Sequence, residues 1–367
     1  MKIVSTSYVN TNSYNDPQEW LDRISFYTGL LEELAKRYEV ESIEQINYNG
    51  RLLQNGVTYH FLNFKKKKLR FPTRLHAYIK SLKPDIVFVN GFVFPIQIIQ
   101  LRRALGKKAK IFVLHRAEKP FAGIKVYLQK LADRSVDAYL FASDEFGEEW
   151  VKKGIITSPK KIHEVMQSSS IFYREDKTVA KTALKIHSNP FFLWVGRLNS
   201  NKDPITVIKA FKNYLSFQPE AKLYMIYQAG ELLDQVKNLI SPESKTKESI
   251  VLVGKVEHRQ LQVWYNAADF FIAGSHYEGS GIAVCEAMSC GCIPVITDII
   301  SFRRMTGPGK CGFLYKPGDP DDLLSKLLKT KEINFESERE KVCQQFKNEL
   351  SFTAITNKIT KVIDTLG

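Results

Sequence analysis

The chain has 367 residues, of which 44% are hydrophobic and 25% are charged, and its formal net charge at pH 7 is +14. This composition is typical of a folded protein long enough for two domains, and it excludes a disordered chain. The sequence has no run of about eighteen apolar residues, and no basic head precedes an apolar run at its N-terminus, so we expect neither a membrane span nor a signal peptide. We therefore expect a cytoplasmic protein.

Short apolar segments alternate with amphipathic ones in the first half of the chain, which is the pattern of βαβ units on a parallel sheet. Strands are expected at residues 2–6, 38–43, 57–62, 85–90, 110–115 and 137–143. Helices are expected between them at residues 21–37, 73–82, 96–105, 123–134 and 145–153.

The same alternation begins again after a polar stretch at residues 172–190. Strands are expected there at residues 191–196, 223–228, 249–254, 269–275, 293–297 and 313–315. The segment after Asp319 has helical periodicity only, and its last helix, at about 352–366, must pack on a sheet that is already built. We therefore predict an α/β fold with two doubly wound, Rossmann-like domains. The predicted parts are residues 1–180, residues 181–345, and a C-terminal helix within residues 346–367 that returns to the first domain.

Two common nucleotide-binding motifs are missing from the sequence. A dinucleotide-binding enzyme carries G-x-G-x-x-G after its first strand, and a P-loop enzyme carries G-x-x-x-x-G-K-[ST]. The first predicted strand is followed by SYVNTNSYN, which has no glycine, and the P-loop string occurs nowhere. Hydride-transfer and P-loop chemistry are therefore disfavoured.

No metal site is predicted. The cysteines are odd in number, and no histidine stands near them at a zinc-ligand spacing, so we expect reduced, buried thiols. These residues are Cys285, Cys290, Cys292, Cys311 and Cys343. The Asp-Pro-Asp string at residues 319–321 has the spacing of a metal-binding D-x-D pattern, but it follows Pro-Gly and precedes a helical segment, so we expect it to cap that helix.

The stretch HYEGSGIAVCEAM, at residues 276–288, places two carboxylates around a glycine-rich loop. The preceding segment is a predicted strand, and IAVCEAMSCG is a predicted short helix that ends at Gly291. The free amides of residues 279–282 then form a helix N-terminus suited to phosphate. Glu278 in the loop and Glu286 in the helix would face different parts of one elongated ligand, as acceptors for its hydroxyl groups.

Basic residues come from a second loop, in WVGRLNSNKDP, which follows the strand at 191–196. Arg197 can bind phosphate oxygens as a fork, and Lys202 adds a point charge. In a doubly wound sheet both loops open onto the crevice where ligands bind. The sequence therefore predicts a site for a phosphate-bearing ligand with vicinal hydroxyl groups.

The strings GRLNSNKDPITVIKAF, ADFFIAGSHYEGSGIAVCEAMSCGCIPVITD and CGFLYKPGDPDDLLSKL resemble the second domain of family 4 retaining glycosyltransferases, in the same order and at the usual spacings. The resemblance covers residues 190–328 strongly and the first domain weakly. It implies a GT-B fold, in which a sugar nucleotide binds the second domain and an acceptor binds the first across a cleft. It also implies a metal-independent hexosyltransferase that uses a nucleoside diphosphate sugar as co-substrate and no cofactor.

The resemblance assigns roles to individual residues. Arg197 and Lys202 would hold the donor diphosphate and stabilise its developing charge, Glu286 would bind the ribose hydroxyls, and Glu278 would contact the transferred sugar or its adjacent phosphate. His115, at the end of a first-domain strand, would touch the donor sugar or orient the acceptor hydroxyl, and no protein nucleophile is implied. The catalytic set is thus His115, Arg197, Lys202 and Glu278. The donor-binding set is Gly196, Gly254, Lys255, Val256, Gly279, Ser280, Gly281, Ile282 and Glu286.

One family feature is missing from the first domain. Members often have a Gly-Gly pair there, near the donor phosphate, whereas this chain offers only Gly29. Alternatives to a transferase of polysaccharide or glycolipid synthesis are another sugar-nucleotide enzyme of this fold, such as an epimerase or a phosphorylase, and a sugar-nucleotide-binding protein without activity.

The positive charge is concentrated in one segment. Residues 51–116 contain fifteen Lys or Arg against one acid, Asp85, so 15 − 1 = +14, and the rest of the chain is close to neutral. The densest part, FLNFKKKKLRFPTR, interleaves Lys65, Lys66, Lys67, Lys68 and Arg70 with aromatic residues. It is either a solvated loop or a peripheral contact with an anionic membrane surface. Nucleic acid is not an expected partner, because no recognised binding module accompanies the charge.

Overall fold

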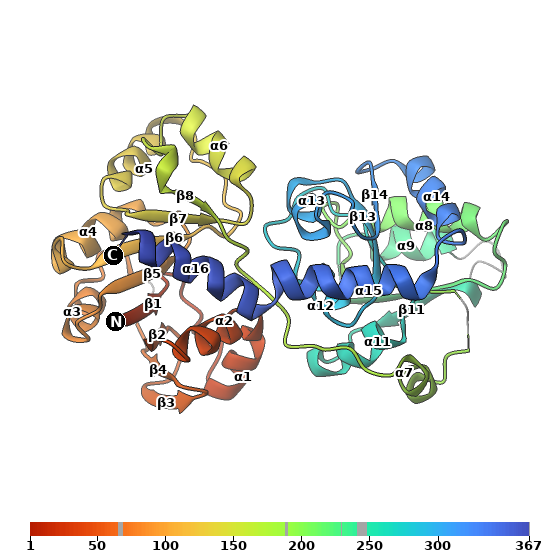
Figure 1. The fold of residues 1–367 in the computed structure, drawn as a ribbon, viewed down its shortest axis with the longest axis horizontal. Coiled ribbons are helices and arrows are strands. Elements are labelled where there is room, and N and C mark those ends of the chain that lie inside the picture. Colours follow the sequence, from red (N-terminus) through yellow and green to blue (C-terminus); the bar gives the residue numbers. More distant parts are fainter. Residues whose placement is uncertain (65–68, 188–189, 229, 241–247, 367) are drawn as a thin grey trace. The chain divides into compact units, whose positions relative to one another are not determined.

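The structure is a computed structural model that describes residues 1–64, 69–187, 190–228, 230–240 and 248–366. The chain divides into two compact units, each built around its own sheet (Figure 1). Unit 1 consists of Met1–Ser169 and Phe352–Gly367, and unit 2 of Ser170–Ser351. This arrangement confirms the predicted α/β fold class, with two doubly wound domains and a C-terminal helix that belongs to the first.

The sheet of unit 1 has eight strands in the order β3-β4-β2-β1-β5-β6-β7-β8. They are β1 (Lys2–Thr6), β2 (Glu39–Glu44), β3 (Gly50–Gln54), β4 (Val57–Phe61), β5 (Ile86–Asn90), β6 (Lys110–Leu114), β7 (Ala138–Phe141) and β8 (Ile162–Glu164). All neighbours pair in parallel except β3 and β4. The first-half strand predictions are confirmed in β1, β2, β4, β5, β6 and β7, whereas β3 and β8 were not predicted.

The β3–β4 pair is an antiparallel hairpin at the sheet edge. Its turn residues Asn55 and Gly56 have φ values of 48° and 82°, which is the left-handed pair that a tight hairpin turn needs. Asn-Gly is a strong hairpin signal, so the sequence did contain a local sign of this strand.

The helices of unit 1 cover both faces of its sheet (Figure 1). They are α1 (Pro17–Arg23), α2 (Ser25–Ala35), α3 (Thr73–Ser81), α4 (Pro95–Leu105), α5 (Val126–Asp133), α6 (Asp144–Lys152), α16 (Phe352–Leu366) and the 3-10 turns η2 (Gly123–Lys125) and η3 (Pro159–Lys161). The single helix predicted at 21–37 is wrong, because the chain leaves helical geometry at Ile24 (φ −105°, ψ 21°) and begins a second helix there.

Gly29, in the middle of α2, serves packing. A Cβ atom at this position would lie 2.5 Å from the ring of Phe352 in α16, so glycine allows the two helices to approach closely. Gly29, the candidate for a phosphate contact in the first domain, therefore forms a helix–helix contact within unit 1 instead.

The sheet of unit 2 has six strands, all parallel, in the order β11-β10-β9-β12-β13-β14. They are β9 (Phe191–Arg197), β10 (Lys222–Gln228), β11 (Ile250–Gly254), β12 (Phe270–Ala273), β13 (Ile293–Thr297) and β14 (Phe313–Tyr315). The helices are α7 (Lys177–Leu184), α8 (Pro204–Tyr214), α9 (Leu233–Ile240), η4 (His258–Gln260), α11 (Leu261–Ala267), α12 (Ile282–Ser289), α13 (Ile300–Thr306), α14 (Pro320–Lys329), α15 (Phe335–Gln345) and the π-helical turn η5 (Phe346–Leu350). Each strand predicted for the second half is present.

The strand order of unit 2 determines where a ligand can bind. From the central strand β9 the chain proceeds to β10 and β11 on one side, and it returns to β12, β13 and β14 on the other. The order therefore reverses between β9 and β12. In open parallel sheets ligands bind outside the carboxyl ends of the strands at such a point.

The unit boundaries differ from the predicted domain limits at 180 and 345. Ser170 Oγ accepts a hydrogen bond from Ser289 Oγ (3.0 Å), and the Glu175 amide donates to Asn266 Oδ1 (2.7 Å), so these residues belong to unit 2. The polar composition of residues 172–190 marks a connection between units, but it does not indicate with which unit each residue forms its hydrogen bonds.

The cysteines are free, and all except Cys343 are buried, as predicted. Burial raises the pKa of the Cys290 thiol to about 12, so it remains protonated at neutral pH. Asp319 caps α14, because its carboxylate accepts hydrogen bonds from the amides of Asp321 and Asp322. Within the described ranges, no group of three or more His, Cys, Asp or Glu residues is arranged to hold a metal ion. Every helix within those ranges is too short or too polar to cross a membrane.

Candidate functional site

Two loops at the carboxyl edge of the unit 2 sheet are tied together at the strand-order reversal. The β9–α8 loop contributes Asn201, whose carbonyl accepts a hydrogen bond from the His276 amide (2.9 Å) in the β12–α12 loop. The Asn201 side chain bonds the Tyr277 backbone in both directions, with its Oδ1 accepting from the amide (3.1 Å) and its Nδ2 donating to the carbonyl (3.0 Å). These bonds fix the loop that carries the basic candidates against the loop that carries the acidic ones.

Gly274 allows this close approach. A Cβ atom there would lie 2.9 Å from the carbonyl oxygen of Asp203 and 3.1 Å from that of Lys202. Asp203 itself has a left-handed backbone (φ 41°) and caps α8 by accepting hydrogen bonds from Thr206. Its carboxylate also lies 3.1 Å from the His276 ring nitrogen Nε2.

Lys202 and Glu278 form an ion pair between the two loops. The Lys202 side chain is 28% exposed and that of Glu278 is 16% exposed, so the pair is partly shielded from water. Arg197, at the end of β9, has an exposed side chain. Gly196 precedes it, and a Cβ atom at this position would lie 3.6 Å from the stem of Lys202. The structure thus brings the predicted cations and Glu278 to one edge of one sheet.

The N-terminus of α12 lies beside this ion pair and has no side-chain cap. Gly279 and Ser280 in the preceding loop and Ile282, the first residue of α12, are partly exposed, whereas the N-cap residue Gly281 is buried. Uncapped amides at a helix N-terminus carry partial positive charge and are suited to bind an anion. The position of this helix agrees with the prediction, and the left-handed Gly291 (φ 75°) follows its end as expected.

Replacing Gly281 by alanine is expected to lower the free energy of unfolding by about 2–4 kcal/mol, from a left-handed backbone and an overpacked contact together. Gly281 has φ 54°, and a Cβ atom there would lie 2.6 Å from the Phe302 ring. Urea unfolding measures the loss. Gly309→Ala is the matched control, because Gly309 has φ 75° but no atom within 4 Å of the added Cβ. Equal losses in the two variants would show that the Phe302 contact is unimportant.

Glu286 is buried one turn inside α12, and both of its carboxylate oxygens have partners. Oε1 lies 2.6 Å from Nε2 of His258, and Oε2 accepts a hydrogen bond of 3.0 Å from the hydroxyl of Tyr265. His258 is 43% exposed, and its ring lies 5.0 Å from that of Phe172. The carboxylate is therefore held in one orientation at the edge of the site.

Gly254, Lys255 and Val256 follow β11 at the same edge of the sheet. Gly254 has φ 86° and open space at its Cβ position, whereas a side chain would be strained there by the backbone. Lys255 is exposed and lies 3.6 Å from Glu257. This turn leads into η4, which carries His258.

His115 lies in unit 1 at the end of β6, and it is only 4% exposed. Its Nε2 lies 2.9 Å from the carbonyl oxygen of Glu118, and its ring packs against Phe141 and Trp150 at centroid distances of 4.3 and 5.5 Å. Burial lowers the pKa of His115, so the imidazole is held neutral. A ring in this setting supports the local structure, and its predicted contact with the donor sugar stays a prediction.

Unit 1 has its own cavity of about 190 Å³ at the carboxyl ends of β1, β2 and β5. Arg116 lines it, donates hydrogen bonds to Asn90 and to the carbonyl of Gln167 (3.0 Å), and lies 4.6 Å from the centroid of the Tyr27 ring. Glu44 lines the cavity too, and burial raises the pKa of its carboxyl group. The cavity therefore combines a cation, hydroxyl groups and a carboxyl group.

Sequence reasoning missed Asn201, His258 and Tyr265. Asn201 lies within the predicted basic loop, but an asparagine in a turn is usually a local turn residue. His258 and Tyr265 stand 28 and 21 residues before the carboxylate that they contact, and nothing local marks that contact.

Comparison with known proteins agrees with this geometry. Residues 176–349 match the family model for glycosyl transferases group 1. The chain is 29% identical over 144 residues to mannosylfructose-phosphate synthase of Agrobacterium fabrum, covering 37% of this chain and 32% of that protein. It is 24% identical over 228 residues to the GDP-mannose:cellobiosyl-diphosphopolyprenol alpha-mannosyltransferase of Xanthomonas campestris, covering 60% of this chain and 58% of that protein.

Among solved structures, the fold resembles that of the Escherichia coli trehalose-6-phosphate protein bound with UDP-2-fluoro glucose. The TM-score is 0.73 at 11% identity, and the match covers 100% of this chain and 99% of that one. This likeness shows a GT-B fold. Residues 176–349 therefore form a glycosyl transferases group 1 domain in a chain that has the GT-B fold.

Proposed function

We propose that the protein is a family 4 retaining glycosyltransferase that moves a sugar from a nucleoside diphosphate donor to a glycan or lipid-linked acceptor. The Lys202–Glu278 ion pair beside the uncapped N-terminus of α12 carries this proposal. It places a cation, a carboxylate and free amides at the strand-order reversal, where a diphosphate and a sugar hydroxyl would need them.

The proposed chemistry is mainly electrostatic. As the glycosidic bond breaks, negative charge grows on the leaving diphosphate, and Lys202, Arg197 and the α12 amides stabilise it. Glu278 accepts a hydrogen bond from a hydroxyl of the transferred sugar, and Glu286 accepts hydrogen bonds from the ribose hydroxyls. Residues 254–256 line the pocket for the base. Because these groups supply the positive charge, we infer that the transfer needs no metal ion and no cofactor. The donor phosphate oxygen takes the acceptor proton, so that no protein base is needed, and no protein nucleophile is proposed.

The names of the relatives suggest a place in glycan synthesis. One acts, by its name, on a diphosphopolyprenol-linked sugar with GDP-mannose as donor. We infer a role in polysaccharide or glycolipid synthesis, and a cytoplasmic location where sugar nucleotides are available.

Turnover tests the proposal. A thermal-shift panel of UDP, GDP, ADP and their common sugars should identify one donor by a raised melting temperature. With that donor the protein should release nucleoside diphosphate, at least slowly to water, at a rate that EDTA leaves unchanged, and the product of transfer should keep the anomeric configuration of the donor. Glu278→Ala should suppress the release. Tight nucleotide binding without turnover across donors and acceptors would instead indicate a binding protein.

A membrane contact is a separate proposal, supported by the basic and aromatic residues of FLNFKKKKLRFPTR at residues 61–74. Lys65–Lys68 lie outside the described residues, but the neighbouring Arg70 and Phe71 are exposed. Replacing the four lysines by glutamine should lower sedimentation with anionic liposomes at low salt by at least about tenfold, since each basic residue near the surface contributes about 1 kcal/mol. The control is Lys107→Gln with Lys108→Gln in an exposed turn of the same unit. Unchanged sedimentation of the four-lysine variant would exclude this contact.

A further inference from the structure

Unit 2 has a second cavity, of about 940 Å³, at the amino edge of its sheet. Lys177 of the cavity lining forms an ion pair with Asp269, which directly precedes β12. Asp269 Oδ2 also accepts a hydrogen bond from the amide of Phe191, the first residue of β9 (2.8 Å), so the cavity lies where these strands begin. The donor site lies at the carboxyl edge, so the length of the strands, roughly 20 Å for β9, separates the two. The lining comes from residues 174–187 and from α15. None of it belongs to the proposed donor site.

Arg339 of α15 is the unusual member of this lining. It is only 6% exposed, and its Nη1 lies 3.9 Å from Glu336 Oε1. Its Nε and Nη2 are buried and have no hydrogen-bond partner among the described residues. These two nitrogens form one edge of the guanidinium group, from which parallel N–H bonds point in the direction that suits a carboxylate or phosphate. A buried charged donor without a partner is costly, so the arrangement indicates a ligand.

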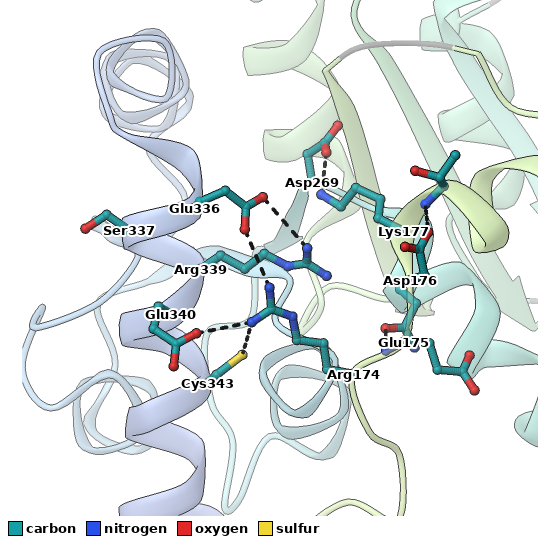
Figure 2. Close-up of polar contacts among 12 residues, drawn as sticks. Arg174, Glu175, Asp176, Lys177, Asp269, Glu336, Ser337, Arg339, Glu340 and Cys343 are labelled. Carbon is teal, nitrogen blue, oxygen red and sulfur yellow. Dashed lines mark hydrogen bonds and ion pairs between the residues drawn. The ribbon is translucent and has the colours of Figure 1, made fainter.

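The other charged groups of the cavity are already paired (Figure 2). Arg174 lies 3.5 Å from Glu336 and 3.2 Å from Glu340. Lys177 lies 2.6 Å from Asp269, and its ammonium group stands 4.1 Å from the centroid of the Phe335 ring.

The acids in the cavity and next to it have partners as well. The second Asp269 oxygen lies 3.3 Å from Lys181, and Asp176 caps α7 by accepting hydrogen bonds from the amides of Thr178 and Val179. Each nearby carboxylate thus has partners of its own, while one edge of Arg339 has none. Both nitrogens are closed off from solvent, so an anion reaches that edge by shifting a neighbouring side chain, and it then supplies the partner that the edge lacks.

We propose that this cavity binds a phosphate group, with the Nε–Nη2 edge of Arg339 as its anchor and Arg174 at its rim. A phosphate has oxygens for the fork of Arg339 and further oxygens for a second cation, and the cavity is large enough for more than the phosphate itself. The ligand is either free phosphate or the phosphate monoester of a small metabolite. Its site is independent of the proposed donor site.

The test uses the full chain carrying Arg197→Ala and Lys202→Ala, which removes the cations proposed to bind phosphate at the donor site. Inorganic phosphate and glucose 6-phosphate are titrated separately by calorimetry. Arg339→Lys keeps the positive charge but removes the two parallel N–H donors of the guanidinium group, so it should weaken binding at least tenfold. Arg174→Gln changes a side chain that is 38% exposed, so folding should be preserved, and it should weaken binding several-fold. Lys237→Gln, an exposed cation on α9, is the control and should have no effect.

Tighter binding of glucose 6-phosphate than of phosphate would support the site and identify a monoester as its ligand, and equal affinities would support the site with free phosphate. The proposal is overturned if neither compound binds, or if binding is unchanged in both Arg339→Lys and Arg174→Gln. Because the readout is binding at a site outside the donor loops, neither result depends on whether the protein turns over a sugar nucleotide.

Discussion

Replacing Lys202 by alanine is expected to lower the rate of nucleoside diphosphate release by about 10²- to 10³-fold, the loss typical of removing one group that stabilises developing charge. Its ammonium group is partly buried and paired with Glu278, so it is held at the carboxyl edge between β9 and β12. The charge on the leaving diphosphate is greatest in the transition state. The loss should therefore appear in kcat more than in KM for the donor, as steady-state kinetics with the donor from the thermal-shift panel would show.

The ion pair also predicts which of two variants binds the nucleoside diphosphate more tightly. Lys202→Ala alone leaves the Glu278 carboxylate unpaired beside the donor phosphates, where it repels them. The double variant Lys202→Ala/Glu278→Ala removes both charges, so it should bind the nucleoside diphosphate more tightly than the single variant although it remains inactive. Lys209→Gln, an exposed position on α8, is the control and should match the unmodified protein. Equal binding by the single and double variants would show that Glu278 does not face the diphosphate.

The carboxyl-edge loops could be predicted because each follows a short apolar strand. The run FFLWVG places Arg197 at the end of β9, and the run before His276 places Glu278 between β12 and α12. Both strands are parallel neighbours, so these loops meet at one edge by topology alone. Local pattern and fold rules were enough for this part of the site.

The remaining parts depend on contacts between distant residues. His115 ends a strand, as predicted, but its burial depends on Phe141 and Trp150, which follow it by more than one element. Gly29 looked available for a ligand until α16, at the other end of the chain, placed Phe352 against it. A single sequence shows where such residues stand, but it does not show which distant side chains cover them.

Glu286 is the residue whose predicted role can be tested most directly from its partners. His258 and Tyr265 each form a hydrogen bond with one carboxylate oxygen of Glu286. Because every carboxylate oxygen has two lone pairs, the carboxylate can still accept hydrogen bonds from two vicinal hydroxyl groups. Glu286→Ala is expected to raise the Kd of the nucleoside diphosphate by about 10- to 100-fold, as for the loss of a hydrogen bond to a charged group. Isothermal titration calorimetry measures this change. Tyr265→Phe keeps the ring and loses only the hydroxyl, so it should raise the Kd by a smaller factor.

Comparison of ligands separates ribose binding from a merely structural role of Glu286. If its carboxylate accepts the ribose hydroxyls, the unmodified protein should bind the nucleoside diphosphate more tightly than its 2′,3′-dideoxy analogue. Glu286→Ala should bind the two alike, because the acceptor that distinguishes them is gone. Tyr265→Phe should retain part of the preference, since it disturbs the orientation of the carboxylate without removing it. If Glu286→Ala kept the full preference for the ribose form, the hydroxyls would have another partner, and Glu286 would serve only to join α12 to His258 and Tyr265.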